Sequence, residues 1–76
     1  MSPLQTIAET VRISRKAQCL RQDQLATAAG VGVRFIVDLE AGKATAQLGK
    51  TLAVLEALGL ELRLTSRSLH PMGDPP

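Results

Sequence analysis

Few side chains in this sequence could take part in covalent or metal chemistry. Cys19 is the single cysteine and His70 the single histidine, so neither an intrachain disulfide nor a cysteine-based zinc site can form. Nothing pairs His70 with a nucleophile or with a cluster of metal ligands. We therefore expect no enzymatic activity, no metal and no cofactor, and we interpret Cys19 as a small residue in a tight connection.

The basic side chains say more about function, because several of them lie close together in the sequence. The first group lies in a stretch without acidic residues and consists of Arg12, Arg15, Lys16 and Arg21. Two more cations, Lys43 and Lys50, flank an apolar segment further along the chain. Such groups suit the phosphates of nucleic acid, and equally the solvated face of a helix. The formal net charge of +2 does not decide between the two.

The elements that position these groups must belong to one small domain. A chain of 76 residues buries only ~60% of the surface that it exposes when unfolded, so stabilisation by a partner is plausible. Its single phenylalanine leaves Leu, Ile, Val and Ala to build the core, which favours packed helices. No apolar run approaches the ~20 residues of a membrane helix, and no signal-peptide pattern opens the chain. We expect a cytoplasmic protein without a membrane partner.

Three helices are indicated by apolar spacing. The first runs from Leu4 to Gln18 behind Ser2 and Pro3, a cap followed by a proline at the first helical position. A short second helix covers about 22–28 and ends at Gly30. A later helix, from about Ala46 to Leu58, is expected to bury four leucines: Leu48, Leu52, Leu55 and Leu58.

The stretch 31–40, "VGVRFIVDLE", fits two structures. Its apolar residues alternate and are rich in β-branched types, which favours a strand. Phe35, Ile36 and Leu39 also form an apolar patch at helical spacing. The local pattern alone leaves both open.

The segment 60–65, "LELRLT", is a clear half-buried strand pattern, with Leu60, Leu62 and Leu64 on one side. If 31–40 is helical, this strand has no mate within the chain. Two copies could then pair it as an antiparallel ribbon, and we expect a homodimer. We assign 1–65 to the domain with this dimerisation strand, and the proline-rich 66–76 to a flexible tail.

A longer pattern spans both short segments and has the spacing of a helix-turn-helix. Gly30 permits the left-handed turn, Ala26 is small where the next helix crosses, and Val31, Ile36 and Leu39 fill the wedge. The run "LRQDQLATAAGVGVRFIVDLEAGK" resembles the helix-turn-helix of the lambda-repressor-like family, and the longer run through "TAQLGKTLAVLEALGL" resembles its HipB-type antitoxins. The resemblance covers about 4–65. It implies a mainly α fold of four to five helices, with 31–40 helical and the short C-terminal strand pairing across a homodimer.

The resemblance also implies site residues, and a helical wheel of 31–40 agrees with it. One side of that helix would face a major groove and supply base contacts from Val33, Arg34, Val37 and Asp38. The Asp38 carboxylate would accept from a cytosine amine or brace Arg34. Phosphate contacts are implied for Gln22, Gly32, Lys43, Thr45, Gln47 and Lys50. Arg15 and Glu40 match a structural ion pair of the family. The sequence departs from the family at Arg21, which replaces a hydroxyl cap, and at Gly32, which replaces a serine.

Several functions fit these expectations. The first is a homodimeric repressor that binds double-stranded DNA at a palindromic operator. The HipB-type resemblance adds autoregulation of a toxin-antitoxin operon and a HipA-like serine/threonine kinase toxin as partner. Alternatives are a free-standing phage-type repressor or restriction-modification controller, and a protein-interaction module that binds DNA weakly.

Overall fold

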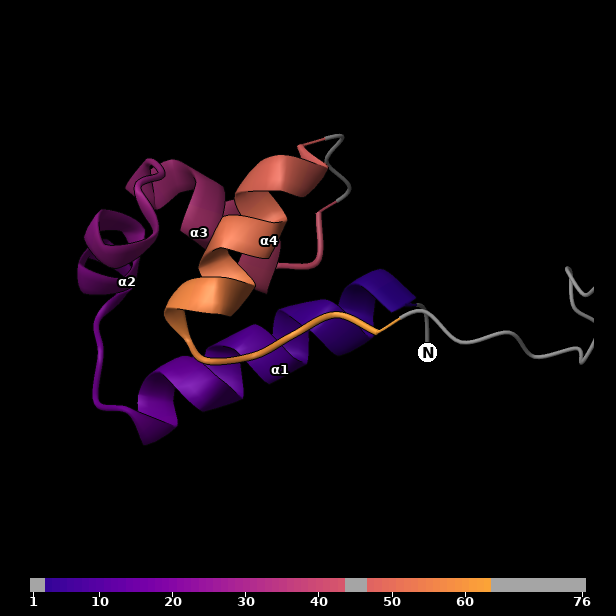
Figure 1. Ribbon diagram of the computed structural model, residues 1–76, viewed down its shortest axis with the longest axis horizontal. Coiled ribbons are helices and arrows are strands. Elements are labelled where there is room, and N and C mark those ends of the chain that lie inside the picture. The colour runs from indigo at the N-terminus through magenta and orange to yellow at the C-terminus, as the bar shows by residue number, and fades with distance from the viewer. Residues whose placement is uncertain (1–2, 44–46, 64–76) are drawn as a thin grey trace, which may run out of the picture.

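The described part of the chain contains four helices. The computed structural model describes residues 3–43 and 47–63, and its helices are α1 (Pro3–Ala17), α2 (Gln22–Ala29), α3 (Val33–Glu40) and α4 (Leu48–Ala57) (Figure 1). The mainly helical fold expected from the sequence is thereby confirmed. The stretch 31–40 contains a helix, α3, so its alternation of apolar residues does not mark a strand.

The connection between α2 and α3 has the geometry of a helix-turn-helix turn. Gly30 has a φ of 73°, and the backbone N–H of Val31 donates to the Ala26 carbonyl over 3.0 Å. These two features end α2 in the left-handed turn that the glycine predicts. At the other end of α2, the backbone N–H of Arg21 donates to the Gln24 side chain over 2.8 Å. This bond satisfies one backbone donor where the usual hydroxyl cap is missing.

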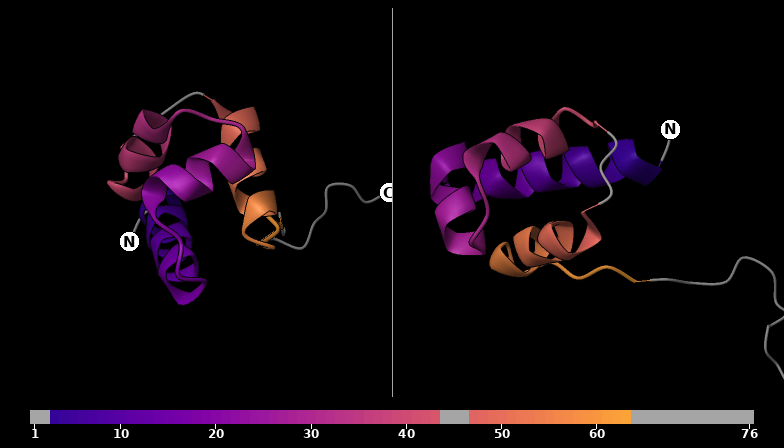
Figure 2. Two further views of the ribbon diagram at one scale, coloured as in Figure 1. Left: turned by 90° about the vertical axis from the view of Figure 1, so that its left-hand side faces the viewer. Right: turned by 90° about the horizontal axis from the view of Figure 1, so that it is seen from above.

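A single apolar core joins the four helices. Five large side chains are almost fully buried: Val11, Leu25, Ile36, Leu39 and Val54. They form one cluster with Ala26, Leu55 and Leu58. Figure 2 shows α2 spanning the space between α3 and α4, which lie to either side of it. Because α2 packs against both of these helices, its short length is compensated by tertiary contacts.

The buried face of α4 differs from the expected one. Leu55 and Leu58 are buried, but Leu48 is 60% and Leu52 is 42% exposed, so their expected burial is wrong. Thr51 and Val54 occupy the core face instead. Burial of Thr51 is tolerated because its hydroxyl donates to the Gln47 carbonyl over 3.3 Å.

The expected C-terminal strand is not supported. Residues 60–63 have no regular secondary structure, and Leu64 lies outside the described residues, as does the assigned tail 66–76. The backbone N–H of Leu60 donates to the Leu55 carbonyl over 2.8 Å, and its side chain packs against the core. The physical reason is that residues 3–43 and 47–63 of one copy contain no strand with which this segment could form a ladder.

Candidate nucleic-acid interface

Helix α3 has one buried side and one exposed side. Ile36 and Leu39 are 0% and 1% exposed and fix the helix against α2 and the core. On the other side, Val33 is 47% and Val37 is 38% exposed, and the Arg34 side chain is 80% exposed. Because the buried side holds α3 rigidly, the exposed side presents an arginine between two valines as a defined surface.

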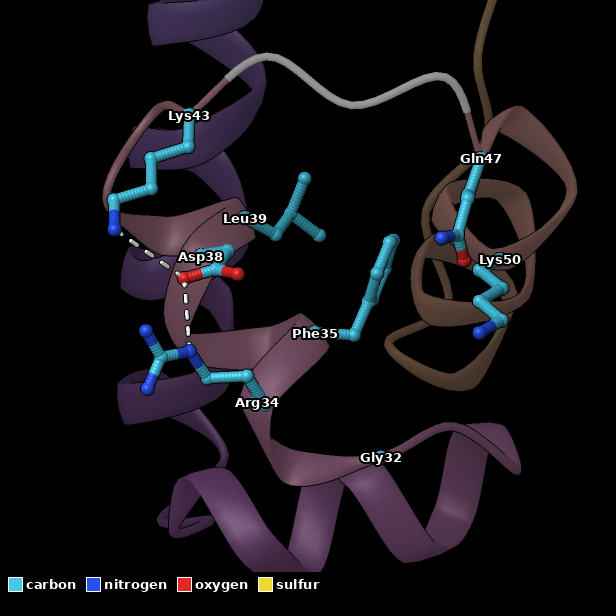
Figure 3. A pocket seen from close by; sticks show the side chains of 8 residues that line it. All are labelled: Gly32, Arg34, Phe35, Asp38, Leu39, Lys43, Gln47 and Lys50. Carbon is cyan, nitrogen blue, oxygen red and sulfur yellow. Dashed lines mark ion pairs between the residues drawn. The ribbon is translucent and has the colours of Figure 1, made fainter.

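Asp38 lies between two cations on this surface. Its Oδ1 is 3.4 Å from Arg34 Nε and 3.6 Å from Lys43 Nζ (Figure 3). The same oxygen is shielded from solvent and has no hydrogen-bond partner among the described residues. Both contacts are therefore ion pairs longer than a charge-assisted hydrogen bond.

A cleft of about 410 Å³ separates α3 from the start of α4 (Figure 3). The ammonium of Lys50 lies 5.9 Å from the centre of the Phe35 ring on one side of this cleft, within the range of a cation–π contact. Three cations and one carboxylate surround the cleft, so its charge is net positive. The full lining is Gly32, Arg34, Phe35, Asp38, Leu39, Lys43, Gln47 and Lys50.

The cleft brings together most of the residues for which the sequence implies DNA contacts. Of the six expected phosphate ligands, Gly32, Lys43, Gln47 and Lys50 line it, beside the expected base contacts Arg34 and Asp38. Val33 and Val37 lie on the exposed side of the same helix. Thr45 lies outside the described residues.

Gln22, the remaining expected phosphate ligand, is the first residue of α2. Its side-chain Nε2 donates to Glu40 Oε1 over 3.3 Å. The carboxamide nitrogen carries a second N–H besides the one that Glu40 accepts. Gln22 is therefore held in place by the end of α3.

Arg15 and Glu40 form a buried, two-pronged ion pair between α1 and α3. Arg15 Nε lies 2.6 Å from Glu40 Oε2, and Arg15 Nη2 lies 3.0 Å from Oε1. A third guanidinium nitrogen, Nη1, donates to the Leu20 carbonyl over 2.7 Å. Only 10% and 4% of the two side chains are exposed. The hydrogen bond to Glu40 raises the pKa of Arg15 above its ordinary value, although burial acts in the opposite direction.

Sequence reasoning missed three contacts of this region. The pairing of Lys43 with Asp38 follows from the turn at Gly42, whose φ is 75°, and from the Lys43 N–H bond to the Asp38 carbonyl over 3.1 Å. The segment "EAGK" carries a signal for such a helix end, because glycine favours the left-handed position. The contact of Lys50 with Phe35 and that of Gln22 with Glu40 join different helices, so no local pattern predicts them.

The described residues provide neither a cluster of metal ligands nor a membrane-spanning helix. Residues 3–43 and 47–63 contain no group of three or more His, Cys, Asp or Glu side chains that could hold a metal ion. Within the same residues, each helix is too short or too polar to cross a lipid bilayer.

Comparison with known proteins identifies the class to which this fold and surface belong. No family model matches the chain. It is similar to an uncharacterised HTH-type transcriptional regulator, y4mF, of Sinorhizobium fredii, with 66% identity over 56 residues that make up 74% of each chain. The chain therefore belongs to the helix-turn-helix transcriptional regulators. DNA-binding transcription regulation is the function class that this membership assigns.

Proposed function

We propose that this protein is a sequence-specific transcriptional repressor that inserts α3 into the major groove of operator DNA. The observation that carries the proposal is the exposed side of α3, where Arg34 stands between Val33 and Val37 on a helix whose other side is buried. Val33 and Val37, exposed at 47% and 38%, are not among the described residues that pack against the apolar core. Their methyl groups suit the thymine methyls of a major groove.

Arg34 supplies the hydrogen bonds of this surface. A guanidinium can donate to both O6 and N7 of a guanine, and each such pair is worth ~1–3 kcal/mol of discrimination against the wrong base. The cations of the neighbouring cleft, Lys43 and Lys50, would contact phosphates together with Gln22. Such contacts fix the position of α3 on the duplex without reading sequence.

A test of base reading compares Arg34→Ala with Lys50→Ala on the preferred duplex and on its single-base-pair variants. Loss of Arg34 should reduce affinity by ~1–3 kcal/mol on the preferred duplex and relax the preference at one base pair. Loss of Lys50 should weaken binding to all duplexes alike. Equal weakening on all duplexes by Arg34→Ala would contradict base reading.

The repressor would act as a homodimer in the cytoplasm. Two α3 helices about 34 Å apart would enter successive major grooves of a palindromic site. The segment 60–65 of two copies is the proposed contact, because Leu62 is 42% exposed and the described residues of one chain contain no strand that could pair with 60–63. Replacing Leu62 with Asp should convert a sedimenting dimer into a monomer, and a stable dimer of the variant would place the interface elsewhere.

The partner of such a repressor is a second part of the proposal. The resemblance to HipB-type antitoxins supports a role as the antitoxin that represses its own operon and binds a HipA-like serine/threonine kinase toxin. An adjacent kinase-like reading frame, and co-purification of its product with this chain, would support that role. A neighbourhood of phage or restriction-modification genes would instead favour a free-standing repressor or controller.

A protein-interaction module with weak DNA binding is the competing function. Salt dependence separates the two, since a dimer that makes about 6–10 phosphate contacts loses about 10³–10⁵ in affinity between 50 and 200 mM salt. A module that binds a protein partner through apolar contacts would show little such dependence.

A further inference from the structure

We infer that Asp38 is a positioning residue that sets the base specificity of Arg34 by holding the Nε of its guanidinium. This inference rests on the proposed function, because it assumes that Arg34 reads the major groove. The sequence leaves two roles open for Asp38, accepting from a cytosine amine or bracing Arg34, and the geometry favours the second.

The first observation is the surroundings of Asp38 Oδ1. This oxygen is shielded from solvent, and Arg34 Nε and Lys43 Nζ lie 3.4 and 3.6 Å from it. A base amine that approached it would have to displace one of the two cations. Oδ1 therefore interacts with the two cations and not with an incoming base.

The second observation is which nitrogen of Arg34 faces Asp38. The contact is made by Nε, and Figure 3 shows the two terminal nitrogens of Arg34 beyond it, one on the side of the carboxylate and the other on the opposite side. The Arg34 side chain is 80% exposed, so without this contact little would restrict its rotation. An Nε held by a carboxylate leaves Nη1 and Nη2 as a pair of donors that can meet O6 and N7 of a guanine.

The third observation is that the backbone fixes Lys43 beside Asp38. The N–H of Lys43 donates to the Asp38 carbonyl over 3.1 Å, and Gly42 N–H donates to the Leu39 carbonyl over 3.1 Å. These two bonds, with a φ of 75° at Gly42, form a Schellman motif at the end of α3. Lys43 is thus built into the same turn as the carboxylate that it faces.

The charges of Arg34, Asp38 and Lys43 influence whether Arg34 binds a base or a phosphate. The three side chains together carry a net charge of +1. Because the Asp38 carboxylate is negative, it lowers the attraction of Arg34 for any phosphate nearby. Without it, Arg34 would be free to pair with phosphates of every DNA sequence. Asp38 therefore favours the base-reading state of Arg34 over the phosphate-bound state.

The test uses Asp38→Asn, which keeps the size of the side chain and removes its charge. The full chain is given a random double-stranded DNA library, and the affinity of each variant is then measured on the selected duplex and on its single-base-pair variants. We expect Asp38→Asn to lower the preference at the base pair read by Arg34 by about threefold to tenfold, part of what one bidentate contact provides. Affinity for unselected DNA should rise, with a salt slope steeper by about one phosphate contact.

The matched control is Glu56→Gln. Glu56 is exposed near the C-terminal end of α4 and does not line the cleft, so this variant makes the same change in net charge outside the proposed DNA and dimer contacts. Base preferences should be unchanged in it. A second variant, Asp38→Ala, repeats the measurement without an amide at position 38. Thermal unfolding followed by circular dichroism verifies that Asp38→Asn and Asp38→Ala both fold.

The Arg34→Ala background decides between positioning and direct contact. If Asp38 acts through Arg34, adding Asp38→Asn to Arg34→Ala changes no base preference further. A change that persists in that background, or one that falls on a different base pair, would overturn the inference and make Asp38 a base-contacting residue. If Arg34→Ala alone leaves every base preference unchanged, the proposed recognition by α3 is refuted instead.

Discussion

The buried pair of Arg15 and Glu40 gives the most quantitative prediction for the fold. Their side chains are 10% and 4% exposed, and two guanidinium nitrogens lie 2.6 and 3.0 Å from the carboxylate oxygens. We choose Arg15→Met, which keeps most of the aliphatic stem and removes the charge. The Glu40 carboxylate is then left buried, with the 3.3 Å bond from Gln22 as its remaining hydrogen bond among the described residues.

The expected loss is large relative to the stability of so small a domain. Removing one partner of a buried ion pair costs about 3–5 kcal/mol, because the other charge stays desolvated. A domain of 76 residues has a free energy of unfolding of about 4–11 kcal/mol. Arg15→Met should therefore lose a large part of that stability. Since 1 kcal/mol corresponds to about 4–8 °C for a domain of this size, its melting temperature should fall by well over 10 °C.

A double substitution tests the physical reason. Arg15→Met with Glu40→Leu replaces both charges by apolar groups, and such replacements of buried pairs are often neutral or stabilising. The double variant should therefore be clearly more stable than Arg15→Met alone. Arg63→Met is the surface control, because its ion pair with Glu61 has side chains that are 80% and 69% exposed and should contribute only ~0–1 kcal/mol.

Urea unfolding followed by circular dichroism at the helical wavelength measures all three variants. Loss of less than about 1 kcal/mol in Arg15→Met would refute the reasoning, since that is the size of a solvent-exposed pair. A double variant no more stable than Arg15→Met would show that geometry, and not desolvation of Glu40, sets the loss.

Three further predictions concern single residues. Gly30→Ala should destabilise the fold by about 1–2 kcal/mol in urea unfolding, because its φ of 73° is strained for a side-chain-bearing residue although nothing lies within 4 Å of the added Cβ; an unchanged midpoint would contradict this. Ile36→Ala should lose about 2–5 kcal/mol in the same assay, because Ile36 is fully buried in the core, and a smaller loss would mean that the core refills the cavity. The hydrogen bond from Arg21 lowers the pKa of Asp23. The small contribution of this pair to stability is therefore present above the unfolded-state pKa of Asp23, and it is lost as pH falls through the folded-state pKa of Asp23. In Asp23→Asn that part of the acid-side pH dependence should vanish, and an unchanged pH profile would show that the pair does not contribute.

The helix-turn-helix itself could be predicted from the sequence, because its determinants are local. Gly30 specifies the left-handed turn, and Ile36 and Leu39 specify the buried side of α3. The apolar residues that alternate in 31–40 lie on two sides of α3. Ile36 and Leu39 are on the buried side, and Val33 and Val37 are exposed on the opposite side.

Other features depend on tertiary contacts that no local pattern contains. Leu48 and Leu52 have the spacing of a core stripe, but Thr51 and Val54 take the buried side of α4, and the packing of α4 against α2 decides which side that is. The strand pattern at 60–65 describes what the segment could form with a partner strand, and the described part of a single chain contains no strand. Asp38 was grouped with base contacts because periodicity places it on α3 without revealing its contact with Lys43.

Footprinting on the DNA upstream of the protein's own gene tests sequence-specific operator binding most directly. At moderate salt we predict two protected patches of related, inverted sequence, separated by about one helical turn, and loss of this pattern in Arg34→Ala. Uniform protection that ignores sequence, or binding to scrambled DNA as tight as to the upstream region, would contradict the proposed recognition through α3.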